Sequence, residues 1–236
     1  MEAGFTYLDQ FITERATRRC WWQALREKFQ KPTFSSRDTA GLCPLTFSLC
    51  FQRIPEGEHK TKMVTLPCSA ISEVFGAISS GKTMFLHNFL AEASARDEVC
   101  ALVDSRGAFD PLSASAAGVN LRRLLWVRCA GRLEHVFKAA DLILHNGGFG
   151  VVVLDLCEVP SRDLNRIPLS YWYRFRLAVE NSPTRLIVTS DQPLVKSCAR
   201  AQLEVKRECF LWRGPVFHGI HFEAQSRRQQ HVQLAG

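Results

Sequence analysis

The chain has 236 residues and a mass of 26.7 kDa, enough for one sizeable hydrophobic core and a small appendage. Hydrophobic residues make up 46% of it and charged residues 22%, which excludes a wholly disordered or collagen-like protein. No apolar run reaches the roughly 18–20 residues of a membrane-spanning helix, and the first residues do not read as a secretory signal. We therefore expect a cytoplasmic protein with no membrane partner.

The charge and the cysteine content give only limited information about the functional class of the protein. The net charge of +7 attracts polyanions such as nucleic acid, nucleotides or an acidic protein, although a solvated basic surface explains it equally well. The nine cysteines form no C-x-x-C pair. Neither a zinc site nor a disulfide framework is indicated, and reduced thiols are the simpler interpretation.

In chain order, residues 1–65 are predicted to form an N-terminal helical arm and an irregular linker. The arm, residues 1–30, carries Trp21, Trp22 and Phe29, which can anchor it in a groove of another protein or pack on its own core. The rest of this segment is rich in proline, glycine, serine and threonine, a composition typical of a linker.

Residues 66–222 are predicted to form an α/β core. A short strand is expected over 71–75, apolar strands over 99–103, 124–127 and 151–155, and a further strand over 186–189. Helices are expected after residue 83, over 133–144 and over 170–181. Strands that are apolar on both faces and alternate with helices indicate a mostly parallel sheet covered on both sides. From residue 202 apolar and polar residues alternate, which predicts antiparallel C-terminal strands. Residues 223–236 are expected to be a flexible tail.

A phosphate-binding loop stands between the first predicted strand and the first predicted helix of this core. Its sequence matches G-x-x-x-x-G-K-[ST] and comprises Gly76, Ala77, Ile78, Ser79, Ser80, Gly81, Lys82 and Thr83. Glycines let backbone N–H groups wrap phosphates, the lysine reaches the β/γ oxygens, and the threonine hydroxyl binds Mg²⁺. A nucleotide site is predicted, and the alternative is a vestigial loop.

A second candidate metal ligand ends the strand Val151–Asp155. An aspartate at the end of a strand near a phosphate loop can hold Mg²⁺ directly or through water. We therefore expect Thr83 and Asp155 to share the metal. The alternative is that Asp155 is an ordinary polar residue at the edge of the sheet.

Two segments carry a family resemblance. EVFGAISSGKT resembles the phosphate loop of RecA, and CALVDSRGAFDPLSASAAGVNLRRLLWV is similar to the RecA segment that follows it. GVNLRRLLWVR and GGFGVVVLDL more closely resemble the ImuA type, RecA-like proteins of bacterial mutagenesis (translesion) cassettes. The resemblance covers about residues 66–206 and implies a RecA-like P-loop ATPase core that binds ATP and Mg²⁺.

Departures from RecA at the site are as informative as the matches. Arg106 stands where RecA has the glutamate that positions the attacking water, and a cation cannot accept the proton of that water, although it can pair with a phosphate. Asp104 either caps the following turn or is linked to the metal. The resemblance implies that Asp110 contacts the adenine base, but Ser113 stands where RecA stacks an aromatic ring.

The regions equivalent to the DNA-binding loops are short. Gln192 matches the RecA residue that senses the γ-phosphate, with an ordinary surface glutamine as the alternative. The segments after Asp155 and after Gln192 lack the long glycine-rich loops of RecA. The aromatic residues over 171–173 can form a stacking platform for single strands or pack a helix on the core.

These features favour an ATP-binding accessory protein of DNA repair in an SOS-type damage response. It would hydrolyse ATP weakly or not at all, act through a recombinase or translesion polymerase-like partner, and bind single-stranded DNA weakly. One alternative is an active RecA-type DNA-dependent ATPase, which Arg106 and the short loops disfavour. A small-molecule P-loop kinase is the second alternative, disfavoured by the lack of a recognisable lid segment.

Overall fold

The computed structural model describes residues 45–48 and 63–229. The N-terminal arm predicted over residues 1–30 lies outside these ranges, as do residues 230–236. No helix in the described ranges is long and apolar enough to cross a membrane.

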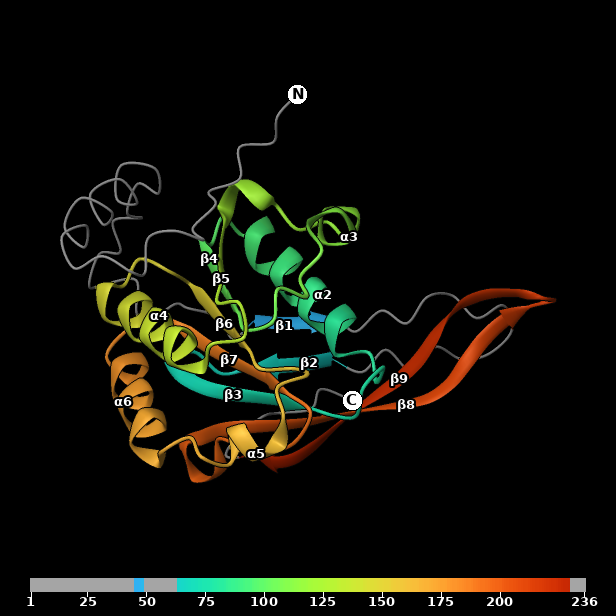
Figure 1. Ribbon diagram of the computed structural model, residues 1–236. Helices are drawn as coiled ribbons and strands as arrows, with labels where there is room; N and C mark the ends of the chain where they lie inside the picture. The colour runs from blue at the N-terminus through green and yellow to red at the C-terminus, as the bar shows by residue number, and fades with distance from the viewer. Residues whose placement is uncertain (1–44, 49–62, 230–236) are drawn as a thin grey trace.

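One seven-stranded sheet forms the centre of the molecule, in the order β5-β4-β6-β7-β3-β8-β9 (Figure 1). All neighbouring pairs from β5 to β8 are parallel, and β9 pairs antiparallel to β8. The prediction of a mostly parallel sheet with antiparallel C-terminal strands is therefore confirmed. The strands are β3 (Ala70–Phe75), β4 (Cys100–Asp104), β5 (Leu124–Arg128), β6 (Val151–Asp155), β7 (Arg185–Ser190), β8 (Ala199–Arg213) and β9 (Val216–Gln229).

Helices cover both faces of the sheet because its central strands are apolar on both sides. In β6, Val152 and Leu154 face one hydrophobic cluster, whereas Val151 and Val153 face the other. The first cluster includes α4 and α6, and the second includes α2 and α3. The helical segments are α2 (Lys82–Ala95), α3 (Pro111–Ala116), α4 (Leu133–Asn146), α5 (Ser161–Leu164) and α6 (Leu169–Glu180), with short 3₁₀ turns η2 (Leu121–Arg123) and η3 (Lys196–Cys198).

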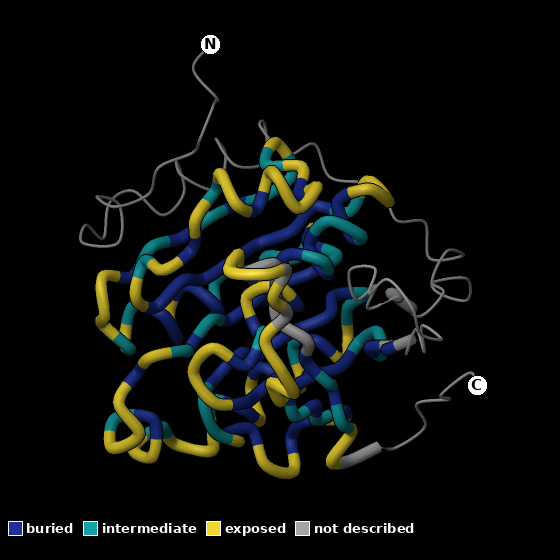
Figure 2. Tube along the Cα trace, turned by 90° about the vertical axis from the view of Figure 1, so that its right-hand side faces the viewer, coloured by how far each residue is buried: buried dark blue, intermediate teal, exposed yellow. Residues whose placement is uncertain are grey.

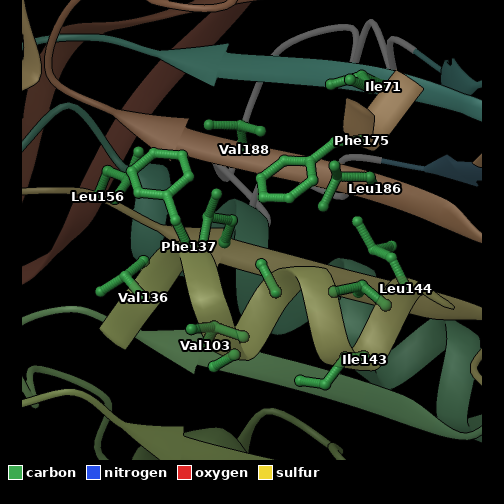
Figure 3. Packing of buried hydrophobic residues seen from close by; sticks show 14 of the residues in the cluster. Ile71, Val103, Val136, Phe137, Ile143, Leu144, Leu156, Phe175, Leu186 and Val188 are labelled. Atoms are coloured by element: carbon green, nitrogen blue, oxygen red, sulfur yellow. The ribbon is translucent and has the colours of Figure 1, made fainter. Parts of the chain in front are cut away.

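Aromatic packing holds α4 and α6 on their face of the sheet (Figure 3). Phe137 of α4 and Phe175 of α6 stack with ring centroids 5.9 Å apart. Both rings are buried in the cluster that includes Leu186 and Val188 of β7. Figure 2 shows the same layering, with buried residues along the central strands and exposed residues at the periphery.

Two expectations about the ends of the core were wrong. The segment before residue 66 is not wholly irregular, because β1 (Leu45–Ser48) and β2 (Met63–Leu66) form an antiparallel pair. Val64 and Leu66 are buried in the cluster that includes α2, and this burial favours an extended strand over a linker.

The C-terminal boundary also differs from the prediction. Residues 223–229 belong to β9 rather than to a tail, since Ala224 is buried and pairs with Val205. In addition, β8 is parallel to β3 along its first part and is antiparallel only to β9. The alternating pattern after residue 202 therefore predicted strands correctly but did not reveal that β8 joins the parallel sheet.

Candidate nucleotide-binding site

The phosphate loop, residues 76–83, connects the end of β3 to the start of α2. Ser79 and Gly81 adopt left-handed backbone conformations, with φ angles of 59° and 101°, and such turns form concave rows of N–H groups that bind anions. Lys82 is the first residue of α2. A phosphate in this loop would therefore lie at the N-terminus of a 14-residue helix, where the helix dipole favours negative charge.

The loop is packed against the C-terminal hairpin formed by β8 and β9. A Cβ atom at Gly76 would overlap the carbonyl oxygen of Val205, and one at Gly81 would lie 2.8 Å from Cδ1 of Phe222. Glycine is thus required at both positions for close packing, and at Gly81 the left-handed φ favours it as well. The motif alone did not reveal this wall behind the loop, because its residues come from strands far along the chain.

Lys82 is surrounded by oxygen atoms. Its Nζ donates to the carbonyl oxygens of Gly76 at 2.6 Å and Ala77 at 2.7 Å, and lies 3.0 Å from Oδ1 of Asp191. Asp191 follows β7, so two strand ends converge on one ammonium group. A phosphate that binds Lys82 must compete with this carboxylate. The phosphate-loop motif does not reveal this competition between Asp191 and phosphate, because Asp191 lies in a distant part of the chain.

Asp155 ends β6 and is paired in register with Thr189 of β7. Its Oδ1 accepts hydrogen bonds from Oγ1 of Thr189 at 2.7 Å and from the N–H of Cys157 at 3.1 Å. Burial raises the pKa of the Asp155 carboxyl, and these hydrogen bonds oppose that rise. Thr83 is exposed at the start of α2. A hydroxyl and a carboxylate are hard oxygen ligands of the kind that Mg²⁺ prefers.

Asp104, the last residue of β4, organises the turn that follows it. Its carboxylate oxygens accept hydrogen bonds from the backbone N–H groups of residues 106–109, at 2.6 to 3.2 Å. Oδ2 also accepts from Nε1 of Trp126 at 3.1 Å. Both oxygens are therefore engaged in holding the turn, which favours the capping role over the metal-linked one.

Arg106 is exposed, and its side chain extends toward the turn after β5. Its Nη1 lies 3.9 Å from the position that a Cβ atom would take on Gly131. The Gly131 N–H donates to the carbonyl oxygen of Ser105 at 2.6 Å, which joins the two turns. Because β4 is separated from β3 by β6 and β7, this direction leads away from the phosphate loop.

Asp110 caps the N-terminus of α3. Its carboxylate accepts hydrogen bonds from the N–H groups of Leu112 at 3.2 Å and Ser113 at 3.0 Å, and from Oγ of Ser113. These bonds hold the pKa of Asp110 below its usual value, with the Ser113 hydroxyl as the largest contributor. Ser113 thus supports Asp110 directly. An adenine amino group would have to share an acceptor that already caps a helix.

Gln192 lies in a short segment that is tied to the strand before the phosphate loop. The carbonyl oxygen of Gln192 accepts from Oγ of Ser190 at 2.8 Å. The N–H groups of Leu194 and Val195, which follow Gln192 in the chain, donate hydrogen bonds to the buried Glu73 of β3, that of Val195 at 3.0 Å. Glu73 therefore fixes the path of the chain that follows Gln192, a role that the sequence alone does not reveal.

The aromatic residues over 171–173 mainly pack α6 on the sheet. Trp172 is buried against Phe137 and Phe175, whereas Tyr173 is half exposed. The helix-packing interpretation is confirmed for Trp172. The residue therefore cannot stack on a nucleic acid base.

Sequence comparisons point to the same part of the molecule. Residues 59–165 match the family model of the RecA N-terminal domain. The chain is 39% identical over 90 residues to the protein RecA of Blastochloris viridis. The aligned segment covers 38% of this chain and 26% of that protein. It is 34% identical over 111 residues to the protein RecA of Chloroflexus aurantiacus. This alignment covers 45% of this chain and 31% of that protein.

The similarity supports a RecA-like family for the matched segment. That segment contains the phosphate loop, Arg106, Asp110 and Asp155, so the candidate nucleotide site lies largely within it. The chain spans about a quarter to a third of the length of these relatives.

Proposed function

We propose that this chain is a RecA-like ATP-binding protein of DNA repair or recombination, of the ImuA type. The observation that carries this proposal is the phosphate loop between β3 and α2, with Lys82 beneath it and Gly81 in the left-handed conformation. When bound at Thr83 and Asp155, Mg²⁺ would neutralise the charge of the β- and γ-phosphates. Asp110 would contribute to base selection, and Gln192 would respond to the γ-phosphate.

The same site is poorly equipped for hydrolysis. Arg106 cannot act as a general base, and its side chain lies toward Gly131 rather than toward the phosphate loop. The neighbouring carboxylate, Asp104, is occupied by backbone N–H groups of residues 106–109. We therefore propose that the protein binds ATP and releases it largely uncleaved, acting as a nucleotide-dependent accessory factor.

The short segments after β6 and β7 favour an accessory role over filament formation on DNA. Only residues 156–160 separate β6 from α5, and only residues 191–198 separate β7 from β8. The second segment is further held by hydrogen bonds to Glu73. We propose that the chain acts in an SOS-type damage response by contacting a recombinase or a translesion polymerase-like protein.

The deciding experiment measures thermal stabilisation by Mg-ATP in Lys82→Ala and in a matched control. The wild-type protein and Lys138→Ala, an exposed lysine of α4, should both gain stability at millimolar Mg-ATP, as linkage requires. Lys82→Ala should lose that gain while keeping its far-ultraviolet circular dichroism spectrum. A wild-type protein that shows no shift would overturn the proposal.

A further inference from the structure

The two C-terminal strands extend well beyond the sheet. β8 pairs with β3 only as far as Phe75 and Glu204, but its pairing with β9 continues to Arg213 and Val216. Residues 206–221 therefore form a two-stranded ribbon that projects from the body of the molecule (Figure 1).

The ribbon leaves the sheet beside the phosphate loop. β8 runs parallel to β3, so it continues past the same edge at which β3 enters the loop. Val205 and Phe222 lie at the base of the ribbon, and they are the residues that pack against Gly76 and Gly81. The ribbon and the candidate nucleotide site thus share a closely packed junction.

A bulge in β8 gathers one arginine and two aromatic residues on one face of the ribbon. Arg207 pairs with Phe222 and Cys209 pairs with His221, so one extra residue lies between these pairs. Since side chains alternate between faces, the extra residue brings Arg207 to the same face as Phe210 and Trp212. The guanidinium of Arg207 accordingly lies over the Phe210 ring, 4.5 Å from its centroid.

This face is exposed and lies on a basic element. Phe210 is 46% exposed and Trp212 is 61% exposed. Residues 206–221 contain three basic residues and one acidic residue, together with two histidines. Exposed aromatic rings beside cationic side chains are the usual equipment for binding single strands, since bases stack on the rings while cations meet the phosphates.

We propose that the ribbon face formed by Arg207, Phe210 and Trp212 binds a single-stranded polynucleotide. Unpaired bases stack on Trp212 and on the Arg207–Phe210 pair, and the basic side chains contact the phosphates. Stacking does not require a particular base, so the binding is sequence-tolerant. Single-strand binding by the ribbon does not require the ATP site, so experiments can refute the ribbon site and the ATP site independently.

Fluorescence anisotropy with labelled oligo-dT, oligo-rU and a duplex, each about 16 nucleotides long, tests this site. The wild-type protein should bind at least one of the single strands more tightly than the duplex, and comparison of the two strands identifies DNA or RNA as the ligand. Phe210→Ala with Trp212→Ala should weaken single-strand binding about tenfold or more. Arg207→Gln should weaken binding and reduce its salt dependence.

Tyr173→Ala is the matched control, because Tyr173 is a half-exposed aromatic residue on α6, and α6 lies on the opposite side of the molecule from the ribbon (Figure 1). It should leave affinity unchanged. All variants should retain stabilisation by Mg-ATP, which separates loss of the ribbon site from unfolding and from failure of the nucleotide site. Unchanged binding in the Phe210/Trp212 double variant, equal affinity for duplex, or no binding of either single strand by the wild-type protein would overturn the proposal.

Discussion

Asp191 lies against the phosphate-loop lysine, with its Oδ1 3.0 Å from Nζ of Lys82. The other oxygen, Oδ2, accepts a hydrogen bond from the N–H of Glu158 at 2.9 Å. One carboxylate therefore links the segment after β6, the segment after β7 and the phosphate loop. Because Lys82 is the cation that a γ-phosphate would meet, the affinity for nucleotide would depend on the free energy needed to separate Lys82 from Asp191.

Replacing Asp191 by asparagine should tighten ATP binding. The substitution removes a negative charge that competes with phosphate for Lys82. The Lys82 side chain is only 8% exposed and that of Asp191 28%, so the value of an exposed pair, about 1 kcal/mol or about fivefold in affinity, is the least change that we expect. Titration with a fluorescent ATP analogue measures the change. Asp97→Asn is the control. Oδ1 of Asp97 lies 2.7 Å from Nη2 of Arg123, and this ion pair is away from the phosphate loop. Weaker binding in Asp191→Asn would show instead that the carboxylate orients Lys82 for phosphate.

ATP turnover should be slow, with little stimulation by single-stranded DNA. Arg106 supplies no general base, and its side chain is directed toward Gly131. For the same reason Arg106→Glu should restore little hydrolysis. A phosphate-release assay on the wild type, Arg106→Glu and the adjacent charge reversal Arg132→Glu makes the comparison. A wild-type turnover of about 1 s⁻¹ or faster, within the range of efficient enzymes, would contradict the expectation.

Gly81→Ala should impair both folding stability and ATP binding. Gly81 has a φ of 101°, and an added Cβ would lie 2.8 Å from the Phe222 ring. Gly148→Ala is a close control, since Gly148 has a φ of 89° but nothing within 4 Å of the added Cβ. Backbone strain alone costs about 1–3 kcal/mol, and overpacking adds about 1–3 kcal/mol at Gly81 only.

Urea denaturation together with Mg-ATP titration separates these two effects of the Gly81 substitution. Only Gly81→Ala should lose nucleotide binding, because only it displaces the wall behind the loop. Equal stability losses in Gly81→Ala and Gly148→Ala would mean that Phe222 moves aside without cost.

Glu73 should make the fold less stable as the pH rises toward neutrality. Burial raises the pKa of the Glu73 carboxyl, and hydrogen bonds from Leu194, Val195 and Gln202 oppose this only in part. Between the unfolded value near 4.5 and the raised folded value, the unfolded state binds fewer protons. The free energy of unfolding therefore falls as pH increases through this window.

Glu73→Gln isolates this contribution, because the amide keeps an acceptor for the N–H groups of Leu194 and Val195 without titrating. Urea denaturation of both proteins from pH 4.5 to 7.5 should show the wild type losing stability relative to Glu73→Gln as pH rises. A constant difference between the two proteins across this range would contradict the raised pKa. Stability gained by the wild type would indicate that the ionised form is favoured.

The sequence alone determined the local architecture of the core. Short strand patterns, most of them apolar runs, predicted β3 to β7, a 3.6-residue period predicted α4, and the motif over residues 76–83 fell between a strand and a helix. These features are encoded within a few neighbouring residues, since strand and helix periodicity and turn chemistry act over short stretches. The parallel arrangement followed because strands apolar on both faces require cover on both sides.

Only the tertiary structure decided which distant groups meet at the site. The ion pair between Lys82 and Asp191, the contact of Phe222 with Gly81, and the direction of Arg106 depend on the strand order β6-β7-β3-β8 and on the register of each pair. The ribbon face depends on one extra residue in β8, which moves Arg207 to the side of Phe210. Strand order arises from packing between segments far apart in the chain. A bulge changes the register by one residue and reverses which side chains share a face, and the alternating pattern alone does not reveal it.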